Sequence, residues 1–302
     1  MFKKICIIGC GLIGSSILRA ANNKKLSQIV SVYDKSNEVL RFLKNQKLTD
    51  YATDDIKIAV KNSELTIISS PLSAYKEIIS KIKNDFNENS ILTDTGSVKR
   101  IVNKIIEESN LKNVSWIASH PIAGTEESGP ASGFADLFQN RWNIICPSKN
   151  AKKSHVKILE KFWKTLGSNT KIMSFDEHDK ILSLTSHLPH AIAYNIVRTS
   201  LGSDQRVRDE VIKYSAGGLR DFTRIASSDP LMWRDIFIDN SENIIEILNQ
   251  FSENIEKFKG LIKQKKGEEL FKIFESTKKV RKAIIDEGQD IDKPDFGRKK
   301  IK

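Results

Sequence analysis

The chain has 302 residues, of which 39% are hydrophobic and 29% charged, and its formal net charge is +11. This length accommodates one large or two ordinary domains with a core of good size. No apolar run approaches the ~20 residues needed to span a bilayer, and no signal-peptide pattern precedes the first apolar segment, so we expect a cytoplasmic protein with no membrane partner.

The cysteines and the basic residues narrow the class further. Cys6, Cys10 and Cys146 lack the spacing of metal ligands and indicate buried thiols in a reducing cytoplasm rather than a disulfide framework. The basic residues are scattered over predicted helices and are not clustered with aromatic residues. We therefore interpret the charge first as a lysine-rich surface and second as steering of an anionic substrate and cofactor, and we expect no nucleic-acid partner.

The first 34 residues carry the strongest local pattern. An apolar run over residues 3–8 predicts a buried strand, residues 9–14 read G-x-G-x-x-G, and residues 15–22 predict a helix. A second apolar run over residues 29–33 ends on Asp34, 34 − 14 = 20 residues beyond the last glycine. This strand–turn–helix–strand context is the one in which the motif binds a dinucleotide.

Each part of this motif has a physical task. Gly9 permits the tight turn, Gly11 lets the backbone approach the pyrophosphate, and Gly14 lets the helix pack closely on the strand. The N–H groups at the helix start attract phosphates. Asp34 accepts hydrogen bonds from the adenosine ribose hydroxyls, which favours NAD over NADP, although Lys35 leaves NADP open. The predicted cofactor-binding residues of this loop also include Leu12 and Ile13.

Strand and helix patterns keep alternating as far as residue 173. Further strands are predicted at residues 65–69, 90–93, 114–118, 142–146 and 170–173, and helices at 37–44, 74–83, 98–108 and 156–166. Such a βαβ series predicts a mostly parallel sheet with right-handed crossovers. The fold class is therefore α/β, with a Rossmann-type dinucleotide-binding domain over residues 1–174.

Strand signals stop at residue 176, and long helical patterns follow. They cover residues 176–201, 205–214, 230–251 and 255–285. We expect an all-helical domain over residues 175–285 and a polar tail over 286–302. One wide apolar stripe fits either an ordinary helical core or, as we favour, a homodimer interface. Its residues are Ile244, Ile245, Ile247, Leu248 and Phe251.

Polar residues at three predicted strand ends indicate where chemistry occurs, because ligands of doubly wound sheets bind outside the carboxyl ends of the strands. One end carries Ser70 and Pro71, which we expect beside the cofactor. His120 leaves a predicted strand at another, where an imidazole can take a proton from a substrate hydroxyl while a nicotinamide takes a hydride. Ser97, at the third, can hydrogen-bond the same hydroxyl or orient the imidazole.

The helical half adds a second set of polar residues. His187 and His190 are three residues apart, near one face of a helix, but no carboxylate or cysteine is spaced to complete a metal site with them, so we expect no metal. Gly217 begins a segment that ends on Arg224, whose guanidinium can bind a carboxylate with two parallel hydrogen bonds. A surface ion pair is the alternative interpretation of Arg224.

Taken together, these motifs resemble those of the prephenate/arogenate (cyclohexadienyl) dehydrogenases of tyrosine biosynthesis. The matching stretches, in family order, are GCGLIG at 9–14, DTGSVK at 94–99, HPIAGTE at 120–126, SHLPHA at 186–191 and GGLRDFTRIASSDPLMWRDI at 217–236. The resemblance implies an N-terminal Rossmann domain, a helical dimerisation domain, and NAD(P)-linked oxidation at C4 of a cyclohexadienol ring with loss of the ring carboxylate as CO2.

The resemblance also implies roles for individual residues. His120 matches the histidine that bonds the C4 hydroxyl, Ser97 the serine that assists it, and Arg224 the arginine that binds the ring carboxylate. Further positions match the lining of the substrate pocket or an ionic network at its mouth, with Asp221 reaching from the partner subunit. They are His187, His190, Thr125 and Gly217 for the lining, and Glu126 and Asp221 for the network.

Two other functions are compatible with parts of the sequence. A 3-hydroxyacid dehydrogenase places a lysine in its first long interdomain helix, and this chain has none between Ile181 and Arg198. A non-enzymatic dinucleotide-sensing or nucleic-acid-binding regulator would use the positive charge, but would not need a base, a serine and an arginine together. Prephenate and arogenate both stay open as substrates, with His190 favouring prephenate.

Overall fold

A computed structural model describes residues 2–201 and 204–287. These residues form one eight-stranded sheet in the order β3-β2-β1-β4-β5-β6-β7-β8. The strands are β1 (Phe2–Ile8), β2 (Ser27–Tyr33), β3 (Ala52–Thr53), β4 (Leu65–Ile68), β5 (Ser90–Asp94), β6 (Val114–Pro121), β7 (Trp142–Pro147) and β8 (Asn169–Ile172). The strands predicted from the apolar runs are confirmed. β3 was not predicted, because two residues are too few to show a period.

Neighbouring strands are parallel from β3 to β6. In the part of the chain that the structure describes, β6 and β7 form the one antiparallel pair of the sheet, and β7 and β8 are parallel to each other. The predicted mostly parallel sheet is therefore confirmed. The antiparallel pair changes one prediction, because it extends β6 beyond residue 118: His120 lies within the strand, opposite Ile144, and does not leave it.

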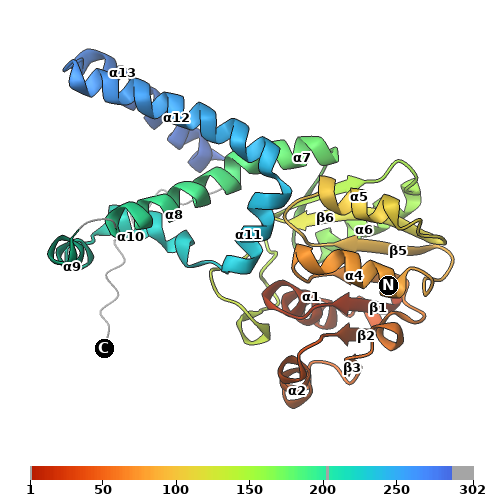
Figure 1. Ribbon diagram of the computed structural model, residues 1–302. Coiled ribbons are helices and arrows are strands. Elements are labelled where there is room, and N and C mark those ends of the chain that lie inside the picture. Colours follow the sequence, from red (N-terminus) through yellow and green to blue (C-terminus); the bar gives the residue numbers. More distant parts are fainter. Residues whose placement is uncertain (1, 202–203, 288–302) are drawn as a thin grey trace. The chain divides into compact units, whose positions relative to one another are not determined.

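Six helices of the first half connect the strands (Figure 1). They are α1 (Leu12–Asn23), α2 (Asn37–Asn45), α3 (Ile56–Val60), α4 (Tyr75–Ile82), α5 (Arg100–Glu108) and α6 (Lys153–Thr165). Side chains cap the N-termini of α2 and α3. The Ser36 hydroxyl accepts a hydrogen bond from the Val39 N–H, and the Asp55 carboxylate accepts from the backbone N–H groups of Lys57 and Ile58. α6 buries Trp163, whose ring meets Phe138 edge to face at 5.4 Å.

The second half is helical, as predicted, but each of its longest predicted helices is interrupted. The elements are α7 (Phe175–Leu182), a π-helical turn (Ser183–His187), α8 (Leu188–Leu201), α9 (Gln205–Lys213), α10 (Gly217–Thr223), a 3-10 turn η4 (Arg224–Ser227), α11 (Pro230–Asp239), α12 (Ser241–Lys263) and α13 (Gly267–Asp286). α10 was not predicted.

Three predicted helices are each interrupted within their predicted range. The one over residues 176–201 is divided by the π-helical turn just before Pro189, whose nitrogen has no hydrogen to donate to an earlier carbonyl. The one over 230–251 is divided at Asn240, which has φ −112° and ψ 25°. The last is divided beside Lys265, whose φ of 55° lies in the left-handed region that a continuing helix does not use.

The chain divides into two compact units. One contains the described residues up to His187 together with Ser227–Asn243, and the other contains Leu188–Ala226 and the described residues from Ile244 onward. The boundary expected at residues 174–175 stays a prediction. Most of the polar tail expected at 286–302 lies outside the described residues, from residue 288 on.

Within the second unit, α10 packs against α8, and α12 and α13 lie side by side (Figure 1). The rings of Phe258 and Phe274 join the latter pair at 6.0 Å. Of the helices that the structure describes, none is at once long and apolar enough to cross a membrane.

Candidate active site

The glycine loop lies where β1 meets β4, the point at which the strand order of the sheet reverses. Gly9 has a φ of 89°, and a Cβ there would lie 2.9 Å from the Ser69 carbonyl oxygen. A Cβ on Gly14 would overlap the Gly9 carbonyl oxygen, whereas a Cβ on Gly11 would meet no heavy atom within 4 Å. Two glycines are thus required by close packing, and the third leaves open space at the N-terminus of α1.

The other predicted cofactor residues adjoin this loop. Asp34 accepts hydrogen bonds from the Cys10 N–H at 2.8 Å and the Ser36 N–H at 2.9 Å, which ties the end of β2 to the loop. The Ser70 hydroxyl is buried and has no hydrogen-bond partner among the described residues. A carboxylate can accept several hydrogen bonds, and a buried hydroxyl normally forms at least one. Asp34 and Ser70 therefore fit a dinucleotide bound over the loop.

A buried ion pair organises the neighbouring end of β5. Lys99 Nζ lies 2.5 Å from Asp94 Oδ2, and neither side chain is exposed. The ammonium also donates to the Ser119 carbonyl at 2.8 Å, while the Tyr75 hydroxyl donates to Asp94 at 3.2 Å. Burial raises the pKa of the Asp94 carboxyl, and the Lys99 charge opposes that rise. The pair joins β5 to β6 one residue before His120.

His120 is hydrogen-bonded to a second buried histidine, His178. Its Nδ1 lies 2.8 Å from Nε2 of His178, and Nδ1 of His178 lies 2.7 Å from Oδ1 of Asp179. Asp179 also accepts the backbone N–H groups of Lys99 at 2.7 Å and Arg100 at 2.9 Å, so it caps α5. Burial lowers the pKa of His120 well below its ordinary value, and His178, Lys99 and His187 lower it further.

Sequence reasoning missed His178, Asp179 and Lys99 as parts of this site. His178 is 58 residues from His120 along the chain, and no spacing rule relates a strand residue to a residue of a later helix. The one available signal was that the dipeptide His178-Asp179 lies five residues beyond residue 173, the end of the last predicted strand.

The remaining predicted residues of the first unit are placed as follows. Ser97 lies in the loop between β5 and α5, and no described hydrogen bond joins it to His120. Thr125 lies in the exposed loop after β6, and its hydroxyl accepts from the Glu127 N–H at 3.2 Å. The assignment of Ser97 and Thr125 to the substrate stays a prediction.

His187 is buried and belongs to a polar cluster around α7 and α11. Its Nδ1 lies 3.1 Å from the Asn240 amide nitrogen, which also donates to the Asp179 carbonyl at 2.9 Å. The Trp233 ring meets the imidazole edge to face at 6.1 Å. α11 is anchored in turn to the segment after Pro71, since Asp235 accepts the Ser73 N–H at 3.1 Å. The structure therefore brings His187 and His120 into one unit around Asp179.

The second unit holds the other predicted substrate residues. His190 is on α8, Gly217 begins α10, and Arg224 begins the turn that follows α10. Arg220 donates to Asp221 at 2.9 Å beside Gly217. Because α10 packs on α8, these elements lie together within their own unit. Over residues 2–201 and 204–287, no group of three or more His, Cys, Asp or Glu residues could hold a metal ion.

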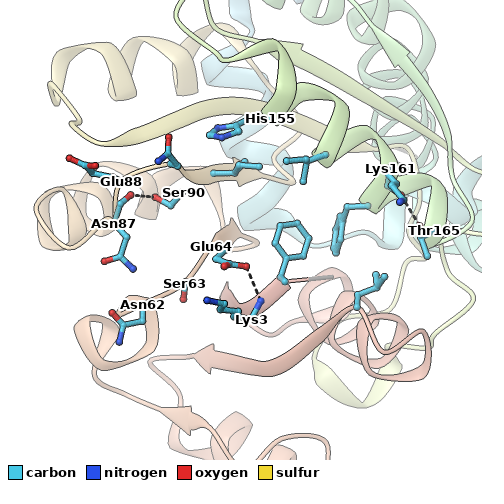
Figure 2. Close-up of a pocket in the computed structure, with 16 residues that line it drawn as sticks. Lys3, Asn62, Ser63, Glu64, Asn87, Glu88, Ser90, His155, Lys161 and Thr165 are labelled. Atoms are coloured by element: carbon cyan, nitrogen blue, oxygen red, sulfur yellow. Dashed lines mark hydrogen bonds between the residues drawn. The ribbon is translucent and has the colours of Figure 1, made fainter.

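A pocket of about 610 Å³ lies at the opposite edge of the sheet (Figure 2). It is lined by the amino-terminal ends of strands, with Lys3, Glu64 and Ser90, and by α6, with His155 and Lys161. Glu64 accepts the Lys3 N–H there at 2.8 Å. None of the predicted site residues lines it. Since ligands of such sheets bind at the carboxyl ends of the strands, this pocket is not the candidate active site.

Comparisons with known proteins agree with the geometry. Residues 17–172 match the nucleotide-binding domain of prephenate dehydrogenase, and residues 174–276 match its dimerization domain. The chain is 37% identical over 284 residues to a cyclohexadienyl dehydrogenase of Zymomonas mobilis, covering 94% of this chain and 97% of that protein. It is 31% identical to a prephenate dehydrogenase of Bacillus subtilis, covering 94% and 76%.

Solved structures give the same result. The prephenate dehydrogenase of Aquifex aeolicus, in complex with hydroxyphenyl propionate and NAD+, superposes with a TM-score of 0.87 at 31% identity, covering 94% of this chain and 99% of that one. The arogenate dehydrogenase of Synechocystis superposes with a TM-score of 0.76 at 19% identity and shares the fold.

The fold and the edge of the sheet thus define a nucleotide-binding oxidoreductase. The chain belongs to the prephenate dehydrogenase family. The resemblance stated from the motifs is confirmed, and this family is favoured over the 3-hydroxyacid dehydrogenase and the non-enzymatic regulator.

Proposed function

We propose that this protein oxidises and decarboxylates prephenate to 4-hydroxyphenylpyruvate, or arogenate to tyrosine, with NAD+ as the hydride acceptor. The observation that carries the proposal is His120: a buried imidazole with a lowered pKa, at the carboxyl edge of a sheet that also carries the glycine loop. A neutral imidazole at that place is a base poised for a substrate hydroxyl. Family membership supports the same reaction.

His120 takes the proton of the C4 hydroxyl, which raises electron density at C4 as the C4–H bond breaks. When bound, the nicotinamide ring supplies an acceptor for the hydride. The bond from the ring to its carboxylate then breaks, its electron pair enters the ring, and CO2 leaves. The ring becomes aromatic, and His120 returns its proton to the phenolate oxygen, so the protein ends as it began. Its task is orientation and one base.

The remaining assignments concern binding. Arg224 binds the ring carboxylate through its planar guanidinium, and Ser97 bonds the C4 hydroxyl. His187, His190, Thr125 and Gly217 line the substrate pocket. His190 favours the keto acid side chain of prephenate over the ammonium of arogenate. Asp34 favours NAD over NADP, because its carboxylate repels a 2′-phosphate.

The protein also acts as a homodimer in this proposal. Residues 174–276 match a dimerization domain, and large apolar side chains are exposed along α12 and α13. Phe271 is 63% exposed, Val280 62%, and Ile262 54%. Apolar surface of this kind on a long helix pair is typical of an interface.

Its three cysteines fit the cytoplasm in which we place it. Cys6, Cys10 and Cys146 are free and buried. Burial raises the pKa of each thiol to about 12, which leaves them protonated and unreactive. Such thiols are typical of a reducing compartment.

One assay tests the proposal. Prephenate and arogenate are each offered with NAD+ and with NADP+ to purified protein, and the reaction is followed by the absorbance of the reduced nicotinamide. We expect rapid turnover of prephenate with NAD+. No turnover in any of the four combinations, with folded protein that still binds NAD+, would refute the proposed function.

Replacing Asp34 with alanine should reduce the discrimination between NAD+ and NADP+. The carboxylate that repels a 2′-phosphate is removed, so we expect KM for NADP+ to fall and KM for NAD+ to rise, each by about tenfold or less, the scale of one hydrogen-bonded charge. Asp50→Ala, which removes an exposed acid nearby in the sequence, is the control. If the ratio of the two KM values stays the same, Asp34 does not read the ribose.

Replacing Arg224 with glutamine should raise KM for the substrate more than it lowers kcat, because the guanidinium binds a carboxylate that is present before the reaction. We expect a rise of about tenfold to 100-fold, the scale of a charge-assisted bidentate pair. Arg206→Gln, an exposed arginine on α9 of the same unit, should leave KM unchanged. An unchanged KM in the Arg224 variant would assign the carboxylate to another anchor, with Arg220 the first to test.

A further inference from the structure

Two buried residues, His178 and Asp179, form a line of hydrogen bonds that ends at His120. The ring nitrogens of His120 and His178 are 2.8 Å apart, and His178 reaches Asp179 at 2.7 Å. The side chains of His178 and Asp179 have no exposure to solvent. The line connects β6 to the middle of α7, and no described residue hydrogen-bonds Nε2 of His120, the nitrogen at its far end.

The hydrogen bonds of Asp179 decide where the protons lie. Its two oxygens accept the N–H groups of Lys99 and Arg100, which can only donate. These donors and the N-terminus of α5 favour the ionised carboxylate, although burial raises the pKa of Asp179. A carboxylate at 2.7 Å requires that Nδ1 of His178 carry the hydrogen between them.

The rest of the line follows from this assignment. Burial lowers the pKa of His178 well below its ordinary value, so the ring is neutral and carries a single N–H. With that hydrogen on Nδ1, Nε2 of His178 is an acceptor, and His120 must donate to it from its own Nδ1. A neutral His120 with hydrogen on Nδ1 has its lone pair on Nε2.

We propose that His178 is a positioning residue of the reaction, which holds His120 in the one tautomer and ring orientation that present the Nε2 lone pair to the substrate hydroxyl. The inference rests on the proposed function, in which His120 is the base. His178 and Asp179 touch neither substrate nor cofactor in this scheme. The proton taken from the hydroxyl stays on Nε2 of His120 until it returns to the product.

The line also stabilises the imidazolium that forms on His120. The surroundings of His120 otherwise oppose a positive charge, because the ring is buried and Lys99, His178 and His187 lie near it. Asp94 is already paired with Lys99. Asp179 is the carboxylate joined to the ring through hydrogen bonds, so it offsets the new charge through His178.

Two substitutions of His178 separate this role from mere packing. In His178→Gln the amide oxygen can accept from Nδ1 of His120, whereas His178→Leu has a similar volume and no acceptor. We expect His178→Leu to lower kcat about 100-fold with substrate KM changed less than about twofold, because most of a general base's contribution depends on its tautomer. His178→Gln should stay within about tenfold of the wild-type kcat, on the same scale.

A spectroscopic readout that needs no turnover accompanies the kinetics. In protein labelled with ¹⁵N-histidine, the His120 signals are assigned by their loss in His120→Asn, and their chemical shifts report which ring nitrogen carries hydrogen. We expect hydrogen on Nδ1 in the wild type and in His178→Gln, and a loss of that preference in His178→Leu. His155→Gln is the matched control, since His155 is a buried histidine that bonds Ser115 at 2.7 Å outside the line.

The outcomes separate the inference from the function on which it rests. An active wild type whose two His178 variants are equally fast or equally slow overturns the inference, and so does hydrogen on Nε2 of His120 in the wild type. A wild type that turns over neither prephenate nor arogenate refutes the proposed function, and the chemical shifts then still decide whether His178 sets the tautomer.

Discussion

Replacing His120 with asparagine is expected to lower kcat by about two orders of magnitude or more, the contribution of a positioned general base. Asparagine is shorter than histidine and keeps a polar side chain in β6, but it cannot accept a proton. Because His120 acts on the hydroxyl as the hydride leaves, kcat and kcat/KM should fall together. The measurement is steady-state turnover of prephenate with NAD+, and near-normal turnover would remove His120 from the mechanism.

The pH dependence of the wild type gives a second check on His120. Burial, with His178, Lys99 and His187 nearby, lowers the pKa of its imidazole well below the ordinary 6.5. The base is active only when neutral, so kcat/KM should hold its plateau down through pH 6.5 and fall only below it. An acid limb of kcat/KM centred above pH 6.5 would contradict the neutral base.

NAD+ binding to His120→Asn, followed by fluorescence titration, should match the wild type and show that the glycine loop is intact.

Replacing Lys99 with methionine is expected to lower the free energy of unfolding by about 3–5 kcal/mol, the cost of leaving one member of a buried ion pair without the other. Lys99 and Asp94 have no exposed side-chain surface, so water cannot replace the lost ammonium. The substitution also frees the Ser119 carbonyl, which precedes His120. Urea denaturation followed by circular dichroism measures the change.

Two further variants make the ion-pair prediction sharp. Lys104→Met removes an exposed lysine from α5, the helix that begins directly after Lys99. Nζ of Lys104 lies 4.0 Å from Oε1 of Glu108, and the substitution should have a much smaller effect. Asp94→Asn combined with Lys99→Met removes both charges and should recover part of the loss, because no buried charge is left unpaired. Equal unfolding midpoints for Lys99→Met and Lys104→Met would contradict a structural role for the pair.

The glycine loop and the strands of the sheet could be predicted because their signals are local. The spacing of Gly9, Gly11 and Gly14 and the distance to Asp34 are set by one turn and one crossover, and buried parallel strands appear as continuous apolar runs. Helix interruptions were harder to predict. At one break, Asn240 is hydrogen-bonded to His187 and Asp179, which lie 53 and 61 residues away. An apolar period continues through such a break, so it predicts one helix where there are two.

The site shows the same division. His120 could be singled out because it follows an apolar run that predicts a strand, and the order of five motifs indicated the family. The partners of His120 could not be found, because a tertiary contact across 58 residues leaves no period in the sequence. Lys99 gave the opposite difficulty: a lysine in a polar motif is normally solvated, and only the structure shows that it is buried against Asp94.

The α/β fold, the dinucleotide loop and the family all follow from the amino-acid sequence, since each depends on spacings that a single turn, strand or helix imposes. Tertiary structure alone placed β7 antiparallel to β6, buried the Lys99–Asp94 pair between two strands, and set His178 and Asp179 behind His120. The physical reason is that these features are contacts between distant segments, and such contacts are decided by packing and by the need to satisfy every buried polar group, not by local backbone preference.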